Sequence, residues 1–398
     1  MFMDLDINVT DTERAVRETT HRFAQDVMRP LGQKLDKLTP EAVIAEDSAL
    51  WDAFRQYGDL GLDVLGNGDG GLTPLEQARI RYITSEELGW GDAGLAIALG
   101  VRGFPMMMAQ LSGNPELVDL VKDNTTGCWA ITEPDHGSDM LDFNEQIKAP
   151  GAEHGRPNIV AKKQGDDYLI SGQKSSWVSC GTIAQAAALF TAVDNGGPGL
   201  DHAVFVVPLD LPGVSRGKAL DKIGQRALNQ GEIFFDGVRV PRSYMAVPPE
   251  AYSATADMVL TNANTGMGTL FAGLARAALE LAVDYAKERK QGGVPIINHQ
   301  SVRGRLFEMF RQVEAARALN RSVVCSNALN GPRLEYAIAS KVTSTQTAFD
   351  VASEALQIFG GNGTSREYPI EKIFRDARAS MIEDGCNYVL GQVAATRF

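Results

Sequence analysis

The sequence predicts an α+β protein in which a helical region, a β region and a second helical region follow one another. Apolar residues recur with a helical period over roughly the first 120 positions and again after Pro248–Pro249. Between about Gly127 and Pro241 the apolar segments are short, and Gly, Asp, Asn and Pro clusters separate them. A chain of 398 residues exceeds one compact core, so we expect two or three packed units.

The N-terminal region contains two segments with clear helical signals. In "DTERAVRETTHRFAQDVMRPLGQKL", Val16, Phe23 and other apolar residues share one face, and Pro30 predicts a late break or kink. In "TPLEQARIRYITSEELG", Thr73 is suited to cap the N-terminus, and Gly89 marks the expected end. We therefore predict a helical first domain.

The middle and C-terminal regions differ in the period of their apolar residues. The segments "YLISG", "AALFTAV", "AVFVVPL" and "GEIFFDGVRVP" are typical of an antiparallel β unit. Farther on, "SVRGRLFEMFRQVEAARALNRSVV" carries one apolar stripe, with Arg and Glu opposite. The stretch "LEYAIASKVTSTQTAFDVASEALQIFGG" predicts another long helix, closed by a double glycine.

Composition excludes several classes of protein. A formal charge of -12 argues against nucleic-acid binding, which depends on basic residues. The acidic N-terminus does not resemble a secretory signal, and we expect no apolar run near the ~20 residues that span a bilayer. The five histidines lie far apart, which disfavours a metal site. The cysteines are also scattered and indicate reduced thiols in a cytoplasmic protein: Cys128, Cys180, Cys325 and Cys386.

Two stretches of the β region could contact a polar ring or a phosphate. In "WAITEPDHGSD", a β segment ends at Thr132, and a turn then presents Ser138 with exposed backbone amides. The alternative is a Pro-Gly turn that only joins two strands. In "GQKSSWVSCG", Trp177 could stack on a flat ring, although an isolated Trp is more often part of the core. Nucleotide signatures such as a P-loop or G-x-G-x-x-G are absent from the sequence.

Two further stretches lie in the C-terminal region. In "YAKERKQGGVPIINHQ", Arg289 could bind a phosphate or simply complement the helix dipole. In "QIFGGNGTSREYPIEKIFRDARASMIEDGC", the glycines permit another group to approach the backbone closely. This stretch ends with two adjacent acids, Glu383 and Asp384, beside Gly385. Such pairs usually lie on a solvated surface.

Taken together and in this order, the stretches resemble the acyl-CoA dehydrogenase family over nearly the whole chain. Five motifs of the family have counterparts in this chain. In order, they are T-E-P-x-A-G-S-D at residues 132–139, W-I-T at 177–179, G-x-R with F-D-x-V-x-V-P at 224–241, E-R-x-x-F-G-x-P-I…H-Q at 288–300 and Q-x-x-G-G-x-G…Y-P…R-D-A at 357–377. Five ordered matches across some 250 residues make the resemblance much more specific than any single motif.

The resemblance implies an acyl-CoA dehydrogenase-like fold with FAD between the β domain and a four-helix bundle. The expected domains are an N-terminal helical domain over 1–124, a middle antiparallel β domain over 125–243 and a C-terminal bundle over 244–398. It also implies a homotetramer or dimer, with an electron-transfer flavoprotein as the electron acceptor.

The resemblance further implies roles for individual residues. Thr132, Trp177 and Ser179 would contact the isoalloxazine ring, and Ser138 the FAD phosphate or the CoA arm. A second set would reach the FAD of the other subunit: Arg289, Gln291, Gln357, Gly360 and Gly361. The remaining expected cofactor contacts are Trp129, Ile131, Val178, Gln300 and Cys386.

The sequence departs from the family pattern at three places near the cofactor. Gly292 stands where the family has Phe, and one residue is added at Ser175–Ser176. Ser179 replaces Thr and keeps the hydroxyl. None of these differences alone abolishes FAD binding.

The family's catalytic Glu corresponds to Asp384 when R-D-A and the later Gly are aligned without gaps, and Glu383 then takes a Tyr position. This base removes the α-proton of the acyl thioester, and its reach here is shorter by roughly 1.5 Å. Some family members place the base on a bundle helix instead, but that position falls near Ala263. Ala263 carries no carboxylate, so that route is closed, and the gap-free alignment favours Asp384 over Glu383 as the base. The neighbours of Ala263, Asn262 and Asn264, could contact the substrate.

The sequence thus predicts FAD-dependent oxidation of an acyl-CoA to an enoyl-CoA. An Asp in the base position resembles the relatives that oxidise alicyclic substrates, so we expect a cyclic or branched acyl group. One alternative is a nitroalkane-oxidase-like flavoenzyme, which also resembles this family and uses an Asp base without CoA. Another is a flavin-binding scaffold that has lost turnover.

Overall fold

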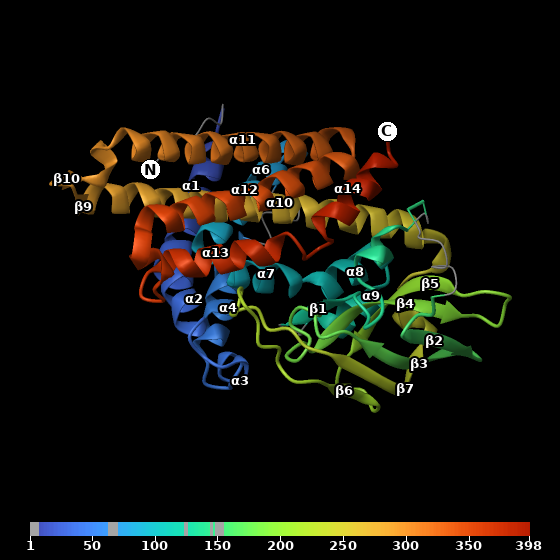
Figure 1. The fold of residues 1–398 in the computed structure, drawn as a ribbon. Coiled ribbons are helices and arrows are strands. Elements are labelled where there is room, and N and C mark those ends of the chain that lie inside the picture. Colours follow the sequence, from blue (N-terminus) through green and yellow to red (C-terminus); the bar gives the residue numbers. More distant parts are fainter. Residues whose placement is uncertain (1–7, 63–70, 123–125, 144–145, 148–154) are drawn as a thin grey trace.

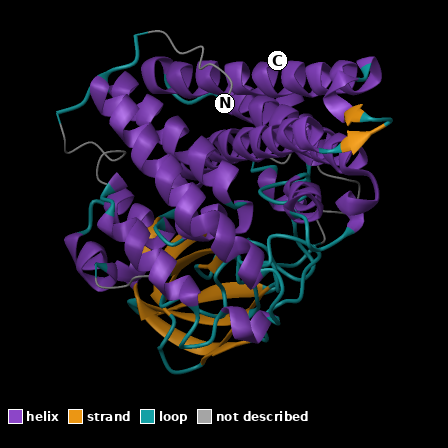
Figure 2. Cartoon of the chain, turned by 90° about the vertical axis from the view of Figure 1, so that its left-hand side faces the viewer, coloured by secondary structure: helices purple, strands orange, loops and turns teal. Residues whose placement is uncertain are grey.

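The computed structural model describes the chain except for residues 1–7, 63–70, 123–125, 144–145 and 148–154. Helices, then a β region, then long helices follow one another along the chain, which confirms the predicted α+β architecture (Figure 1). Viewed from the side, the sheet lies beneath the helices of the C-terminal bundle (Figure 2).

The N-terminal region is helical throughout its described elements. These are α1 (Asp11–Phe23), a π-helical turn (Ala24–Met28), α2 (Arg29–Leu35), α3 (Pro40–Val43), α4 (Ala49–Asp59), α6 (Pro74–Gly91), α7 (Ala93–Val101), α8 (Phe104–Ser112) and α9 (Pro115–Val121). Thr10 and Thr73 each form a capping box with the Glu three residues later. Pro30 lies in the first turn of α2, where a missing N–H is tolerated.

Helix α6 extends to Gly91, beyond the predicted end at Gly89. Gly89 serves helix packing instead, because a Cβ there would lie 2.0 Å from the carbonyl oxygen of Leu270. The glycine therefore permits close approach between α6 and the first bundle helix.

The middle region forms a sheet that is mainly antiparallel, as predicted, but two of its strand pairs are parallel, which the sequence did not predict. Its strands are β1 (Gly127–Ala130), β2 (Ile159–Gln164), β3 (Asp167–Lys174), β4 (Ala186–Asp194), β5 (Asp201–Pro208), β6 (Val214–Arg216), β7 (Ile233–Pro241) and β8 (Met245–Val247). The order is β6-β7-β3-β2-β4-β5-β8, with β1 beside β4. Strand β4 pairs in parallel with β1 and β2, and long connections join both pairs, as a parallel pair requires.

The C-terminal region is a bundle of long helices. These are α10 (Pro249–Glu288), α11 (Gln300–Asn330), α12 (Leu334–Phe359), α13 (Pro369–Ser380) and α14 (Asn387–Ala395). Helix α10 has 40 residues and is therefore roughly 60 Å long. A two-stranded ribbon, β9 (Lys290–Gln291) with β10 (Val294–Pro295), forms the tip of the bundle (Figure 1).

Two stretches are longer and more apolar than predicted from the sequence, which indicated no run long enough to span a bilayer. Residues 93–112 and α10 are long and apolar enough to cross a membrane by length and composition. In α10, however, 78% of the most apolar window is buried inside the protein, and in 93–112 the share is 50%. Buried core helices of soluble proteins pass the same test, so these stretches are weak evidence for a membrane span.

Candidate active site

The two acids Glu383 and Asp384 lie in the short loop between α13 and α14. Asp384 has a φ of 49°, and Gly385 a φ of 100°. Left-handed backbone is uncommon and costly for residues other than Gly, and it concentrates at functional sites. A Cβ on Gly385 would come within 2.5 Å of a methyl group of Leu141, so this position requires glycine.

The loop is held from two sides. On one side the fully buried Lys341 of α12 donates hydrogen bonds to the carbonyl oxygen of Gly385 at 2.8 Å and to Oδ1 of Asn387 at 2.9 Å. On the other side the N–H of Cys386 donates to Oγ of Ser138 at 2.9 Å. The loop therefore joins the helical bundle to the turn after β1.

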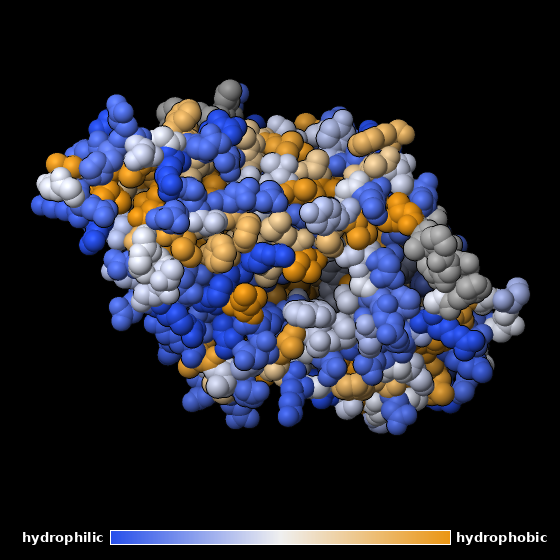
Figure 3. Space-filling view, in the orientation of Figure 1, coloured by the Kyte–Doolittle hydropathy of each residue, from blue (hydrophilic) through white to orange (hydrophobic). Residues whose placement is uncertain are grey.

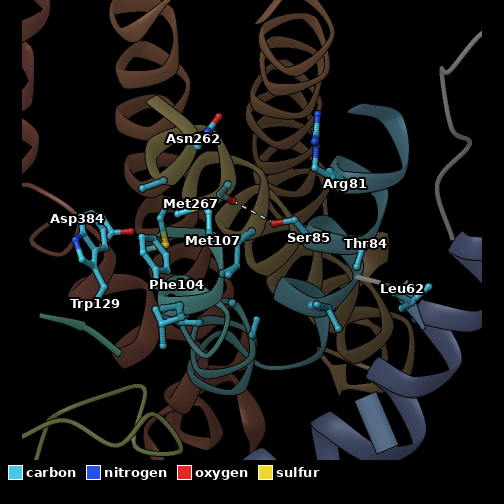
Figure 4. Close-up of a pocket in the computed structure, with 18 of the residues that line it drawn as sticks. Leu62, Arg81, Thr84, Ser85, Phe104, Met107, Trp129, Asn262, Met267 and Asp384 are labelled. Atoms are coloured by element: carbon cyan, nitrogen blue, oxygen red, sulfur yellow. Dashed lines mark hydrogen bonds between the residues drawn. The ribbon is translucent and has the colours of Figure 1, made fainter. Parts of the chain in front are cut away.

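Asp384 lines one end of an elongated cavity of about 360 Å³, between α6, α7, α8 and α10. In Figure 4, Asp384 and Trp129 lie at one end, Leu62 and Thr84 lie toward the other, and Met107 lies between them. The walls are mainly apolar, and the size is typical of a small-molecule site. Among the described residues that line the cavity, Asp384 is the only acid.

The neighbouring Glu383 belongs to a different environment. Its Oε1 accepts a hydrogen bond of 2.5 Å from Nε2 of Gln225, and it does not line the cavity. Burial raises the pKa of Glu383 to about 7, against the hydrogen bond from Gln225 and the charge of Lys222. Burial also raises the pKa of Asp384, and the charge of Lys341 opposes this effect. Only Asp384 faces the space that a substrate could occupy.

Gln225 connects the β region to α13 and was not singled out from the sequence beyond its place in the G-x-R motif. It has a φ of 50°, and its N–H donates to Oδ1 of Asp376 at 2.5 Å. Asp376 also accepts from Lys372 at 2.6 Å. The sequence signal that could have identified Gln225 is its polar side chain within the glycine-containing G-x-R motif.

Three residues expected at the flavin ring lie close together at the edge of the β region. The N–H of Ser175 donates to the carbonyl oxygen of Thr132 at 2.9 Å. Nε2 of Gln230 donates to the carbonyl oxygen of Trp177 at 3.0 Å and to Oγ of Ser179 at 3.3 Å. Trp177 is 57% exposed, so it is not a core residue. Sequence reasoning missed Gln230, which fixes the turn carrying Trp177.

A buried ion pair supports the segment with Thr132. Nζ of Lys174 donates to Oε1 of Glu133 at 2.9 Å and to the carbonyl oxygen of Ile131 at 2.7 Å. Burial lowers the pKa of Lys174 to about 8, and Glu133 opposes this effect. The pair holds the end of β1 against β3, so the backbone of Ile131 and Thr132 is fixed.

The residues expected to serve the FAD of another subunit lie far away at the tip of the bundle, and Gln300 lies there with them. Arg289 follows Ala263 by 26 residues, or roughly 39 Å along and just beyond α10. The exposed members of this set are Arg289, Gln291, Gln300, Gln357, Gly360 and Gly361. Apart from each glycine and its chain neighbours, no described residue has a heavy atom within 4 Å of a Cβ placed on Gly360 or Gly361, so a ligand can approach their backbone. The structure does not bring this set together with Asp384 in one subunit.

The two asparagines of α10 are also separated. Asn262 lines the cavity near Asp384. Asn264 is fully buried, and its Nδ2 donates to the carbonyl oxygen of Leu260 at 3.0 Å. Only Asn262 is placed to touch a molecule in the cavity.

The residues at the edge of the β region fit the flavin that the family resemblance implies. The exposed indole of Trp177 offers a flat face, and the hydroxyl of Ser179 lies beside it. Nε1 of Trp129, in the cavity lining with Asp384, is buried and has no hydrogen-bond partner among the described residues. The surface is hollowed where the bundle meets the β region (Figure 3). A planar, polar ring system could lie there with its edge toward the cavity.

Comparison with known families divides the chain as the structure does. Residues 10–119, 128–238 and 254–398 match the N-terminal, middle and C-terminal domains of acyl-CoA dehydrogenases. The three matches follow the helical, β and helical regions in order.

Individual relatives match over almost the full length. The chain is 30% identical to a short-chain specific acyl-CoA dehydrogenase from Megasphaera elsdenii, with 97% of each chain covered. It is 29% identical to a benzylmalonyl-CoA dehydrogenase from Aromatoleum aromaticum, with 98% of this chain and 99% of that one covered. The solved butyryl-CoA dehydrogenase of Megasphaera elsdenii superposes with a TM-score of 0.83 at 27% identity, with 99% of both chains covered.

Proposed function

The chain belongs to the acyl-CoA dehydrogenase family, and from that premise we propose that it oxidises an acyl-CoA thioester to an enoyl-CoA with Asp384 as the base. The family is FAD-dependent, and bound FAD supplies the acceptor for the hydride that leaves the β-carbon. The domains of this enzyme would be residues 1–124, 125–243 and 244–398.

The position of Asp384 carries the proposal. Its carboxylate lies at the end of the apolar cavity where Trp129 marks the edge of the β region. Burial raises the pKa of Asp384, which brings the carboxylate closer to the basicity that proton transfer near neutral pH requires. Lys341 and Ser138 hold the loop through its backbone, so the side chain of Asp384 is left to take the α-proton.

Other residues would bind and orient. We assign Thr132, Trp177, Ser179 and Gln230 to the face of the isoalloxazine ring, with Trp129, Ile131, Val178 and Cys386 behind or beside it. Ser138 would contact the FAD phosphate or the CoA arm, and Asn262 the substrate. Asn264 would act only indirectly, because its side chain is buried within the bundle.

We further propose a cyclic or branched acyl group. Asp384 reaches roughly 1.5 Å less far than Glu would. A substrate whose α-carbon lies nearer to the loop compensates for this, and a bulky ring beside the flavin has that effect. The elongated, mainly apolar cavity of about 360 Å³ is compatible with such a group.

The second set of expected cofactor residues supports an oligomer. Arg289 and Gly360 are exposed at the tip of the bundle, far from Asp384, so they would serve the FAD of another subunit in a dimer or tetramer. An electron-transfer flavoprotein would reoxidise the enzyme. We also propose a cytoplasmic location, where the four cysteines, which the structure describes as free, would remain reduced.

Anaerobic mixing with a panel of acyl-CoA esters tests the proposal. We expect cyclic and branched esters to bleach the flavin faster than butyryl-CoA or octanoyl-CoA, and Asp384→Glu to slow the reaction with the preferred ester. Faster bleaching by straight chains, improved further by Asp384→Glu, would contradict the substrate assignment. Turnover of nitroalkanes with oxygen, without any response to CoA esters, would replace the proposed reaction.

A further inference from the structure

The wall that α6 contributes to the cavity is polar at one place. Ile80, Arg81, Thr84, Ser85 and Leu88 line the cavity from successive turns of this helix. Residues three and four apart share a helix face, so the polar members form one patch between two apolar residues. In Figure 4 this patch lies on the side of the cavity opposite Asp384 and Trp129.

Thr84 is the unusual member of the patch. It is only 9% exposed, and its Oγ1 is buried without a hydrogen-bond partner within the part of the chain that the structure describes. A buried hydroxyl without a partner is unfavourable, and native proteins rarely leave one in that state. Because Thr84 lines the cavity, a molecule in the cavity can supply the missing partner.

The neighbours of Thr84 indicate which chemical group of that molecule would contact the hydroxyl. Ser85 already donates from its Oγ to the carbonyl oxygen of Gly266 at 3.2 Å, so its proton is committed to α10. Arg81 lines the same end of the cavity, and its exposed side chain adds a positive charge there without a hydrogen bond to the Thr84 hydroxyl. A hydroxyl donor at an end of the cavity that also carries a cation favours an electron-rich oxygen.

The cavity is long enough to separate this patch from the reacting carbons. Its α10 wall extends from Val259 to Leu270, which is roughly 16 Å along the helix. Asp384 lies at one end of that length and Thr84 toward the other (Figure 4). An oxygen bound at Thr84 therefore belongs to the part of an acyl group remote from the thioester.

We propose, on the basis of the acyl-CoA dehydrogenase function above, that the substrate carries a hydrogen-bond-accepting oxygen on the remote part of its acyl group, and that Thr84 binds it. A ketone oxygen and a carboxylate oxygen share this chemistry. Thr84 is then a specificity-determining residue. It does not touch the carbons that react.

The test compares three CoA esters of equal chain length: a simple alkanoyl ester, its ω-1 keto derivative and the corresponding dicarboxylic monoester. Acyl chains of six to ten carbons are compared. Anaerobic flavin reduction gives an apparent second-order rate constant for each ester, and titration of the oxidised enzyme gives its Kd. We expect one of the oxygenated esters to be preferred by about tenfold or more over the alkanoyl ester. Preference for the dicarboxylic monoester would identify the carboxylate, and preference for the keto ester the ketone.

The variant Thr84→Val removes the hydroxyl while keeping the shape of the side chain. It should lower the rate constant and affinity for the oxygenated ester and leave those for the alkanoyl ester unchanged or improved. An unchanged ratio in Thr84→Val overturns the proposal. If this variant does not fold, the wild-type panel alone decides, because equal or better use of the alkanoyl ester also overturns it. No flavin reduction by any of the three esters would count against the proposed dehydrogenase function itself.

Discussion

Two pairs of adjacent acids within the described residues behave in opposite ways: Glu86 and Glu87 are buried, and Glu383 and Asp384 are partly buried. Glu86 and Glu87 lie in the middle of α6, whereas Glu383 and Asp384 lie in the loop after α13. Both pairs have limited contact with bulk water, and a carboxylate without partners is costly away from water. The difference between them is the number and kind of partners that compensate for burial.

The pair on α6 is surrounded by cations. Nη1 of Arg276 lies 2.7 Å from Glu86, and Nη2 of the same side chain lies 2.5 Å from Glu87. Arg317 adds a contact of 2.8 Å with Glu86, and His21 lies 2.8 Å from Glu87. Burial acts to raise the pKa of Glu87, but Arg276 and the hydrogen bond with His21 outweigh it and hold the pKa at about 2.

The pair in the loop has much weaker compensation. Lys341 is directed at the backbone of Gly385 and not at either carboxylate, and a neutral amide, that of Gln225, contacts Glu383. The pKa of both acids is therefore raised. A buried acid with saturated partners stabilises helix packing, whereas one with few partners retains affinity for a proton. The second condition is the one that a catalytic base needs.

The largest expected effect separates the two acids of the loop. Asp384→Asn should reduce the rate of flavin reduction by roughly 10²–10⁴-fold, because it removes a positioned base. The fold should remain intact, because the change removes a buried charge. Glu383→Gln is the matched control and should have a much smaller effect, because its side chain does not face the cavity. Stopped-flow reduction of the flavin measures both, and the reverse order of effects would show that Glu383 is the base.

The next effect concerns the pair on α6 and should appear in stability. Arg276→Met leaves Glu86 and Glu87 with fewer cations in a buried place, which typically costs about 3–5 kcal/mol. Chemical denaturation followed by circular dichroism measures the free energy of unfolding. Arg55→Met, which breaks the exposed pair with Asp52, serves as the control and should cost at most about 1 kcal/mol. Equal losses in the two variants would contradict the contrast drawn between the pairs.

The pH dependence of stability should distinguish the two pairs as well. Because the pKa of Glu87 is lowered in the folded state, its carboxylate stabilises that state at pH values above the ordinary pKa of Glu. This contribution is lost as the pH falls toward about 2. Glu383 has the opposite sign: its pKa is raised to about 7, so the folded state loses stability as the pH rises from about 4.5 to 7.

Much of this arrangement could be predicted from sequence, and the rest depends on packing. The order of domains and the place of Asp384 followed from ordered motifs. The parallel pairing of β4 did not, because strand direction depends on which distant segments become neighbours. The positions of Lys341 and Gln225 were equally hidden, because each acts across 44 or more residues of chain. Sequence showed two acids side by side; only the structure showed that they face different surroundings.

The smallest expected effect concerns Lys341, which changes the pKa of Asp384 but does not itself take a proton from the substrate. Burial raises the pKa of Asp384, and the charge of Lys341 lowers it. Lys341 itself has a pKa of about 8, lowered by burial, so it is mainly charged at neutral pH. Besides Lys341, the charged group that interacts with Asp384 is Glu383 on the same loop. Removing the lysine charge leaves Asp384 protonated at higher pH, and a protonated acid cannot take the α-proton.

Lys341→Met should therefore move the acid limb of the pH–rate profile to higher pH and lower the rate at neutral pH. Raising the pH should restore part of the lost rate. Asn387→Ala is the matched control, because it removes one hydrogen bond of the same lysine without removing its charge. If both variants lose activity equally at every pH, Lys341 only holds the loop in place. A shift of the limb in Lys341→Met alone would show that a single buried cation, placed on the backbone beside the base, sets the proton affinity that distinguishes this acid pair from the one on α6.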